Sequence, residues 1–397
     1  MTTTQRTRFF AAGAALAVVA LLLSGCTSSG SSNSSSPTPS FSGKVQIGVE
    51  GPITGDQAVT GEGMVNGAKL AAKELNAKGG INGKEVVIVP IDDKADPTAG
   101  VTAANAAIEQ GLDGVIGPYN SGVGVKTLPL YIGADLVPIR LTSNSSTNSL
   151  GYTLQPMDYQ IAPVASDGLV KFLKAKKVAI IYDSTALYTQ QIAKSLRKSL
   201  TAAGATTTAY IAISPGKSGY TAQVAAAAAT KPDVIYAATY FPEGGLIAKA
   251  IKASGTTAKC VADYGSDDPG FITTAGLEAA KNCEVVGVPA PSDFPKGPDF
   301  VAAYKKEFNT EPGTWSPYTY DSLNLLAKAA TDAKGFGKKG LTDALNQVKD
   351  WEGVTGLVTI DPNTGNRDPA TVVYLNVDDN SEFHVNQDWA TAVGADY

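Results

Sequence analysis

The chain has 397 residues and a net charge of −5, with 32 basic residues against 37 acidic ones. Its length suggests two domains, and a hydrophobic content of 43 % is enough for a large core. No clustered basic face is visible, so nucleic acid is excluded as the expected partner, because phosphate binding needs clustered Lys and Arg. A single histidine leaves little room for catalytic dyads and triads.

The N-terminus has the pattern of an export signal. Arg6 and Arg8 precede an apolar run at residues 9–23, which is the length of a signal-peptide core and short for a membrane span. The run leads into Leu22-Leu23-Ser24-Gly25-Cys26, which resembles a bacterial lipobox, the signal whose cysteine is acylated and becomes the new N-terminus. We predict a lipoprotein signal peptide at 1–25 and lipidation at Cys26. An ordinary signal peptide with a chance cysteine is the alternative.

Residues 26–43 are mostly Ser, Gly, Thr and Pro without apolar periodicity. Such a composition cannot bury a core and indicates a flexible tether. No later segment is long and apolar enough to span a bilayer. We therefore expect a folded body at the cell surface, outside the cytoplasm, that is anchored to the membrane by its N-terminal lipid.

From Lys44 onward, short apolar strands alternate with amphipathic helices, which predicts parallel sheets covered by helices on both faces. The alternation restarts near Lys177, and the last hundred residues are too few for a third unit. The first unit has expected strands at 45–49, 85–91, 114–116 and 137–141, and expected helices at 63–77, 98–109 and 121–132. The second has expected strands at 178–182, 206–213, 234–239, near 261 and near 285, and expected helices at 190–203, 221–229 and 246–253. The remainder has expected helices at 300–308, 320–333 and 341–349, and expected strands at 355–360 and 371–376.

The predicted fold is therefore α/β, with two Rossmann-like lobes built on parallel sheets. We assign residues 44–157 and 289–366 to lobe 1, and residues 158–288 and 367–397 to lobe 2. Parallel sheets bind ligands at the carboxyl ends of their strands. Two facing sheets would thus form a cleft of strand ends and helix N-termini, and the free N–H groups there suit a carboxylate.

Cys260 and Cys283 remain in the folded body. Export to an oxidising compartment favours a disulfide between them, which would close a loop of about 23 residues and contribute ~3 kcal/mol on the chain-entropy model. Two buried free thiols are the alternative.

Candidates for catalysis, metals and cofactors are weak. His384 lies in an expected terminal strand or loop, which favours a surface or packed role. The doublets Asp92-Asp93 and Asp267-Asp268 follow strands, where carboxylates are usually solvated or capping. The glycines at 61–67 begin too far from the preceding strand for a dinucleotide loop, and Gly216-Lys217-Ser218 lacks the first glycine of a P-loop. We expect no metal, no cofactor and no enzymatic activity.

An ordered series of short motifs, from about residue 44 to about 376, resembles the type I periplasmic binding proteins. Within that family it is most similar to the branched-chain amino-acid binding subfamily. The matching stretches are Gly51-Pro52-Ile53-Thr54-Gly55, Leu75 to Gly83, Asp92-Asp93 with Asp96-Pro97, Val115-Ile116-Gly117-Pro118 with Ser121, Lys177 to Asp183, Lys231 to Tyr236, Tyr320-Asp321-Ser322 and Gly353-Val354-Thr355-Gly356.

The resemblance implies two lobes that are joined by three crossings and close over a ligand. It implies that the ligand carboxylate is held by Ser121 and by Thr142 or Asn144. N-capping of the helix by Ser121 alone is the alternative. Aromatic cleft positions of the family match Tyr188, Tyr240 and Trp315, although each could instead be core. The full set of expected ligand-binding residues is Thr60, Tyr119, Asn120, Ser121, Thr142, Ser143, Asn144, Tyr188, Tyr240, Tyr264 and Trp315.

The departures from the family pattern concern ligand identity. The family usually carries an acid that pairs with the ligand's ammonium; here Tyr264 stands in its place. Asp263 lies one residue earlier, where strand alternation would point it the other way. Thr60 replaces a common aromatic residue. A buried ammonium without a counter-charge is costly, so an aromatic or amide-bearing ligand without a free ammonium fits the cleft at least as well as leucine.

The resemblance implies a monomeric solute receptor that delivers an amino acid or a related small polar or aromatic molecule to an ABC permease and its ATPase. Two alternatives stay open from the sequence. One is a ligand-sensing module for a separate membrane signalling partner, and the less favoured one is a hydrolase that uses cleft carboxylates.

Overall fold

The computed structural model describes residues 40–395. The predicted signal peptide, the predicted lipidation site Cys26 and nearly all of the predicted tether lie outside the described residues. Within 40–395, the helices are all too short or too polar to cross a bilayer.

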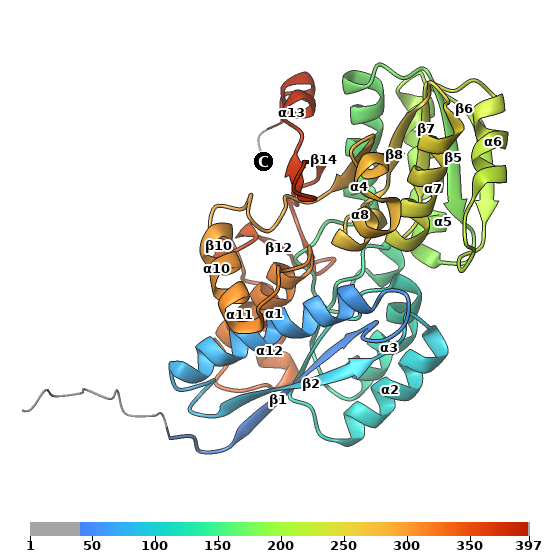
Figure 1. The fold of residues 1–397 in the computed structure, drawn as a ribbon. Helices are drawn as coiled ribbons and strands as arrows, with labels where there is room; N and C mark the ends of the chain where they lie inside the picture. Colours follow the sequence, from blue (N-terminus) through green and yellow to red (C-terminus); the bar gives the residue numbers. More distant parts are fainter. Residues whose placement is uncertain (1–39, 396–397) are drawn as a thin grey trace, which may run out of the picture. The chain divides into compact units, whose positions relative to one another are not determined.

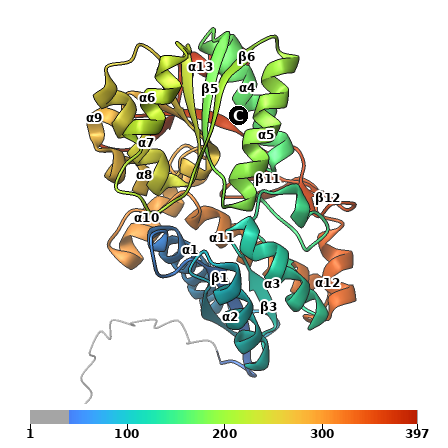
Figure 2. The ribbon, with the colours of Figure 1, turned by 90° about the vertical axis from the view of Figure 1, so that its right-hand side faces the viewer.

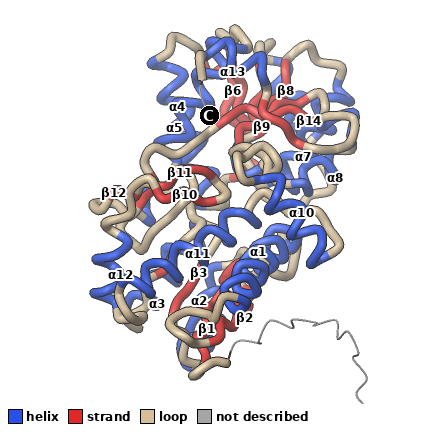
Figure 3. The backbone as a smooth tube through the Cα atoms, turned by 90° about the vertical axis from the view of Figure 1, so that its left-hand side faces the viewer, coloured by secondary structure: helices blue, strands red, loops and turns tan. Residues whose placement is uncertain are grey.

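Lobe 1 is built on a four-stranded, fully parallel sheet in the order β2-β1-β3-β4. Helices α1 and α11 pack against each other and against β1, β2 and β3, while α2 and α3 pack as a pair on the other face (Figures 1 and 3). The strands are β1 (Lys44–Gly51), β2 (Glu85–Asp92), β3 (Gly114–Ile116) and β4 (Pro138–Ile139). The helices are α1 (Ala58–Ala77), α2 (Pro97–Glu109), α3 (Ser121–Gly133) and α11 (Ser316–Asp332).

Lobe 2 is built on a seven-stranded sheet in the order β15-β14-β9-β8-β7-β5-β6. Five strands are parallel, and β14 and β15 extend the sheet in antiparallel fashion. Figure 2 shows α6 and α7 on one side of this sheet and α4 and α5 on the other. The strands are β5 (Lys177–Asp183), β6 (Thr206–Ile213), β7 (Val234–Ala238), β8 (Lys259–Ala262), β9 (Cys283–Gly287), β14 (Val373–Val377) and β15 (Phe383–Val385). The helices are α4 (Asp158–Asp167), α5 (Leu187–Ala202), α6 (Thr221–Ala229), α7 (Phe241–Ser254), α8 (Pro269–Ala275), α9 (Leu277–Ala280) and α13 (Gln387–Val393).

The chain passes between the two sheets three times: after β4, after β9, and before β14. One apolar cluster runs through both lobes, and a smaller separate cluster packs between the lobe 1 sheet and the helices α2 and α3. The α/β fold with two parallel-sheet lobes is thus confirmed, while the residue boundaries of the lobes stay a prediction. The remaining elements are α10 (Gly297–Phe308), α12 (Lys338–Leu345), the hairpins β10 (Trp351–Gly353) with β11 (Gly356–Val358) and β12 (Ile360–Asp361) with β13 (Asn366–Arg367), and the short turns η1 (Ser145–Thr147), η2 (Gly168–Phe172) and η3 (Tyr264–Ser266).

Helix α1 begins at Ala58, five residues before the predicted start at Gly63. The glycines at 61–67 lie inside the helix, where Gly63 and Gly67 allow α11 to approach closely. A Cβ at position 67 would lie 2.2 Å from the carbonyl oxygen of Ser316. Tertiary packing therefore outweighs the low helix propensity of glycine, and Thr60 falls in the first turn of α1 instead of in a loop.

Several other elements have no clear hydrophobic period and therefore differ from the prediction. Helix α4 went unpredicted because it contains Pro163 and a short apolar stripe, and α8, α9 and α13 are too short for a clear period. The strand predicted at 355–360 is divided between β11 and β12, which belong to two separate hairpins.

The structure joins Cys260 to Cys283 by a disulfide. The two residues are register partners at the beginnings of the neighbouring parallel strands β8 and β9. Both are buried, and the cleft residues described below follow the opposite end of β8.

We predict that the double variant Cys260→Ala/Cys283→Ala is less stable than the wild type by about 3 kcal/mol, because the disulfide restricts a loop with a sequence separation of 23 in the unfolded chain. Scanning calorimetry of the unliganded protein should show a melting temperature lower by several degrees. A native protein whose two thiols react freely with a thiol reagent, or a variant that melts with the wild type, would contradict this.

Candidate functional site

Five aromatic side chains form a closed ring between the two lobes. The ring centroids of Tyr119 and Tyr240 are 5.9 Å apart, those of Tyr240 and Tyr188 are 6.0 Å apart, and those of Tyr188 and Tyr264 are 6.4 Å apart. Trp315 completes the cycle, at 5.3 Å from Tyr264 and 5.5 Å from Tyr119. All five are at most 7 % exposed, and all five are residues that the sequence predicted at the ligand site.

Each of the five aromatic residues lies close to the end of a strand or the start of a helix. Tyr119 lies between β3 and α3, Tyr188 is the second residue of α5, and Tyr240 precedes α7 directly. Trp315 precedes α11, and Tyr264 follows β8 by two residues. Because the carboxyl ends of parallel strands lie at one edge of a sheet, residues far apart in sequence meet there.

The four tyrosines of the ring line a cavity of about 10 Å³, which is room for roughly one water molecule, and Trp315 does not belong to its lining. Six of its lining residues were predicted from the sequence; Leu141 and Gly265 also line it and were not. The predicted residues in the lining are Tyr119, Ser121, Ser143, Tyr188, Tyr240 and Tyr264. In this conformation the aromatic rings themselves fill the space between the lobes, so a ligand of amino-acid size requires the rings to separate.

Ser121 is the first residue of α3 and lines the cavity. Its Oγ accepts a hydrogen bond from the backbone N–H of Asn144 at 3.3 Å. The N-cap residue Asn120 makes no side-chain capping bond, and Ser121 itself is inside the helix, so the alternative of N-capping by Ser121 is not what the geometry shows. A hydroxyl beside an uncapped helix N-terminus suits a carboxylate.

Three predicted residues lie beside the cavity instead of in its lining. Asn120 lines a groove of about 350 Å³ that both lobes form and that shares Tyr240 with the cavity. Thr142 is buried, and its Oγ1 lies 2.8 Å from that of Thr147. The side chain of Asn144 accepts from Ser146 N–H at 2.9 Å and donates to the carbonyl of Leu187 in lobe 2 at 3.4 Å.

Two lobe 1 hydroxyls bind two adjacent carboxylates of lobe 2. Thr60 donates to Asp268 at 2.6 Å, and Thr314 donates to Asp267 at 3.2 Å. Asp268 also caps α8 by accepting from Gly270 N–H. Both carboxyl groups are buried, which contradicts the solvated alternative for this doublet. Thr60 thus holds the lobes together here and does not line the cavity.

Burial raises the pKa of Asp267 to about 8 and that of Asp268 to about 6. The hydrogen bonds from Thr314, Val288 N–H, Thr60 and Gly270 N–H act in the opposite direction, but they are smaller than the cost of removing the charges from water. Neither carboxylate has a Lys or Arg partner within salt-bridge distance among residues 40–395.

Asp263 and Tyr264 have different partners, as strand alternation predicted. Asp263 accepts hydrogen bonds from the hydroxyls of Tyr188, at 2.8 Å, and Tyr236. Tyr264 donates its hydroxyl to Gln155 at 3.2 Å, across the ring toward the first crossing segment. The residues of the described chain that line the cavity include no carboxylate.

Arg140 is fully buried beside Thr142. Its guanidinium donates to the carbonyl of Thr142 at 3.1 Å and to the side chain of Asn366. Arg140 therefore joins the first crossing, which follows β4, to β13, which directly precedes the third crossing. Burial lowers its pKa to about 9. The partners within hydrogen-bond reach are neutral oxygens and the sulfur of Met157, which makes Arg140 a structural link between the crossings.

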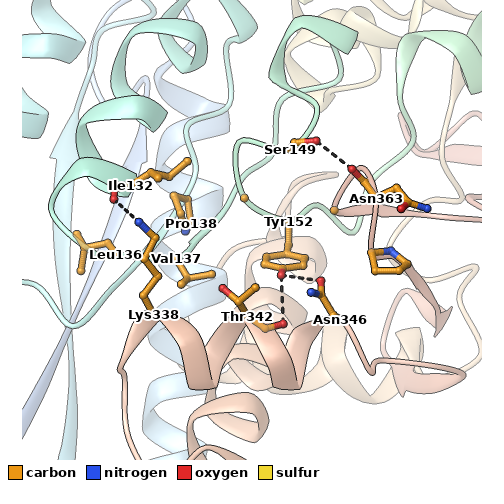
Figure 4. A pocket seen from close by; sticks show the side chains of 13 residues that line it. Ile132, Leu136, Val137, Pro138, Ser149, Tyr152, Lys338, Thr342, Asn346 and Asn363 are labelled. Atoms are coloured by element: carbon orange, nitrogen blue, oxygen red, sulfur yellow. Dashed lines mark hydrogen bonds between the residues drawn. The ribbon is translucent and has the colours of Figure 1, made fainter.

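Another pocket lies within lobe 1, between α12 and the segments on either side of β4 (Figure 4). Its walls bond to each other: Tyr152 donates to Asn346 at 2.8 Å, and Lys338 donates to the carbonyl of Ile132 at 2.8 Å. The predicted ligand-binding residues do not line it, so the aromatic ring remains the candidate site.

His384 lies in β15, where a surface or packed role was expected, and it is partly exposed. Its Nε2 lies 3.6 Å from Asp378 and 4.0 Å from Glu382, and its Nδ1 lies 3.6 Å from Asp293. Within residues 40–395, Asp378, Glu382 and His384 are the one group close enough together to hold a metal ion, and they do not line the aromatic cavity.

The chain is similar to known periplasmic receptors along most of its length. The periplasmic binding protein family matches residues 44–379. A Leu/Ile/Val-binding protein, BraC3, of Rhizobium johnstonii is 33 % identical over 266 residues, which are 65 % of this chain and 71 % of that protein. An amino acid binding protein of Pseudomonas aeruginosa is 31 % identical over 296 residues, covering 73 % and 79 %.

Solved structures show the same architecture. A leucine binding protein of Thermotoga maritima has a TM-score of 0.80 at 24 % identity and covers 87 % of this chain and 99 % of its own. The substrate binding protein of a branched-chain amino acid transporter from Streptococcus pneumoniae, solved with isoleucine, has a TM-score of 0.78 at 26 % identity and covers 86 % and 99 %.

We predict that the unliganded protein loses stability as the pH rises from about 4 to about 8. Acids whose pKa is raised by folding bind more protons in the folded state, so their contribution is complete below the unfolded pKa and is lost as the pH rises through about 6 for Asp268 and about 8 for Asp267. Melting temperatures measured across this range should fall by several degrees. The variant Asp267→Asn should reduce the slope, chiefly between about pH 6 and 8, while Asp268 and the other buried acids keep part of it; a slope equal to or steeper than that of the wild type would contradict the assignment.

Proposed function

The chain belongs to the periplasmic binding protein family, and from that premise we propose that it is the solute receptor of an ABC importer for branched-chain amino acids. The family is not enzymatic. The observation that carries the proposal is the aromatic ring with Ser121 and the start of α3 at its edge, because it provides an apolar enclosure for a side chain and a polar end for a carboxylate.

The residues support a trap that closes on its ligand. Tyr119, Trp315 and Ser121 belong to lobe 1, and Tyr188, Tyr240 and Tyr264 belong to lobe 2. A molecule between them contacts both lobes at once, so it stabilises the conformation in which the lobes meet. The hydrogen bonds Thr60–Asp268 and Thr314–Asp267 are available to that conformation. A permease that binds the closed form would then receive loaded receptor in preference to empty receptor.

The relatives' names favour branched-chain amino acids, whereas the absence of a carboxylate from the cavity lining leaves an aromatic or amide-bearing ligand without an ammonium as the competing class. Isothermal titration calorimetry on the purified full chain decides between these ligand classes. We expect leucine, isoleucine or valine to bind at micromolar concentration or below, and to raise the melting temperature with the logarithm of ligand concentration. Binding of benzoate or an aromatic amide, with no response to the three amino acids, would overturn the proposed ligand.

The variant Ser121→Ala tests the carboxylate end of the site. We expect about a tenfold weaker affinity for the amino acid, because the variant removes a hydroxyl that would bind a charged group. Ser166→Ala is a matched control, because Ser166 is buried in α4 and its Oγ has no partner in the described chain. Equal losses in both variants would show a general effect on folding.

We further propose that the receptor is a lipoprotein anchored at the cell surface through Cys26. The support is the lipobox-like sequence before Cys26 and the Ser- and Gly-rich stretch after it. We expect the wild type to fractionate with membranes and Cys26→Ala to appear in the soluble extracytoplasmic fraction, as followed by immunoblot. Membrane association that is unchanged in Cys26→Ala would refute the anchor, and Ser28→Ala controls for a substitution in the same stretch.

A further inference from the structure

The carboxylate of Asp263 lies directly behind the cavity wall. Asp263 follows β8 and has no measurable exposure. The hydroxyl of Tyr188 donates to it at 2.8 Å, and Tyr188 itself lines the cavity. Asp263 is therefore one hydrogen bond away from any ligand that touches the Tyr188 hydroxyl, although it does not contact the cavity.

Because the hydroxyl of Tyr188 donates to Asp263, its oxygen is left as a hydrogen-bond acceptor. A hydroxyl that gives its proton to a carboxylate keeps its oxygen lone pairs for a second donor, and the carboxylate polarises that oxygen. Burial raises the pKa of Asp263 to about 6, and the hydrogen bonds from Tyr236 and Tyr188 counteract the rise. The carboxylate is thus mostly ionised at neutral pH, and its charge acts through the Tyr188 oxygen on whatever lies in the cavity.

A second carboxylate near this side of the site has the same sign. Asp268 follows Asp263 in the same loop and is buried, and its pKa of about 6 leaves it mostly ionised at neutral pH, whereas Asp267, with a pKa of about 8, is mostly protonated. The lining residues of the described chain include no Lys or Arg. Four tyrosine side chains also line the space, and the face of an aromatic ring attracts cations. The lobe 2 side of the cavity therefore favours a positively charged group.

We propose that the ligand carries an ammonium group and that Asp263 recognises it indirectly, through the hydroxyl of Tyr188, in place of an acid in the cavity lining. The inference rests on the proposed function, in which Ser121 and the start of α3 receive the carboxylate. The ammonium end of the zwitterion is then recognised by the Tyr188 hydroxyl, because Tyr264 occupies the position of the acid that usually binds it in the family. Tyr188 would contact the ligand, and Asp263 would be a positioning and charge-supplying residue behind it.

The test compares leucine with 4-methylpentanoate, which is leucine without its ammonium. Calorimetry on the full-length wild type should show leucine binding about tenfold to a hundredfold more tightly, the range expected for one hydrogen bond to a charged group. Tyr188→Phe and Asp263→Asn should each weaken leucine binding by about tenfold and change 4-methylpentanoate binding by less than about twofold, so that the preference for the ammonium collapses.

Tyr220→Phe is the matched control, because Tyr220 is a buried lobe 2 tyrosine whose hydroxyl donates to the carbonyl of Ser214 and which does not line the cavity. It should keep the wild-type preference. Melting curves of the unliganded variants report folding, and Tyr188→Phe alone carries the test if Asp263→Asn does not fold.

The outcomes separate this inference from the proposed function. Equal affinity of the wild type for leucine and 4-methylpentanoate would overturn the ammonium assignment and leave the solute receptor intact. Equal losses for both compounds in Tyr188→Phe would overturn the indirect route through Asp263. A wild type that binds neither compound, nor isoleucine or valine, would overturn the proposed function and this inference with it.

Discussion

The candidate site exists because the carboxyl-end edges of the two parallel sheets face each other. Each parallel sheet places its strand termini and the following helix starts at one edge, and in this chain the two edges share five aromatic side chains. Each ring contacts the next across or along the lobe boundary, so moving one lobe breaks several contacts at once. That coupling is the physical basis of a receptor whose conformation reports whether the space is filled.

Polar groups at this boundary follow a consistent pattern. Asp263, Asp267 and Asp268 are buried, and their hydrogen-bond partners are hydroxyls and backbone N–H groups of the described chain. Arg140, on the first crossing segment, is bound by neutral oxygens and the sulfur of Met157. A charge that is solvated by dipoles tolerates separation of the lobes better than a tight ion pair, because water can replace a hydroxyl at modest cost whereas a broken buried pair leaves an uncompensated charge. The pattern suits a boundary that must open and close repeatedly.

The structure gives the replacement of the family's acid by Tyr264 a different meaning from the one that the sequence suggested. From the sequence, Tyr264 in place of an acid suggested a ligand without an ammonium. In the structure Tyr264 turns toward Gln155, while Asp263 binds the hydroxyl of Tyr188 in the cavity wall. A negative charge is therefore present beside the cavity although none lines it. This difference depends on two neighbouring residues after β8 that have different hydrogen-bond partners, Tyr188 and Tyr236 for Asp263 and Gln155 for Tyr264.

The sequence by itself determined the strand–helix alternation, the two parallel-sheet lobes and the aromatic residues of the site, because hydrophobic period and the motifs at strand ends are local signals. Only the tertiary structure decided that Thr60 lies in a helix and binds Asp268, that Asn120 and Thr142 lie beside the cavity, and that the doublet at 267–268 is buried. These facts depend on which strand end faces which across the lobe boundary. That arrangement is fixed by long-range packing, such as the approach of α1 to α11 at Gly67, and has no local signature.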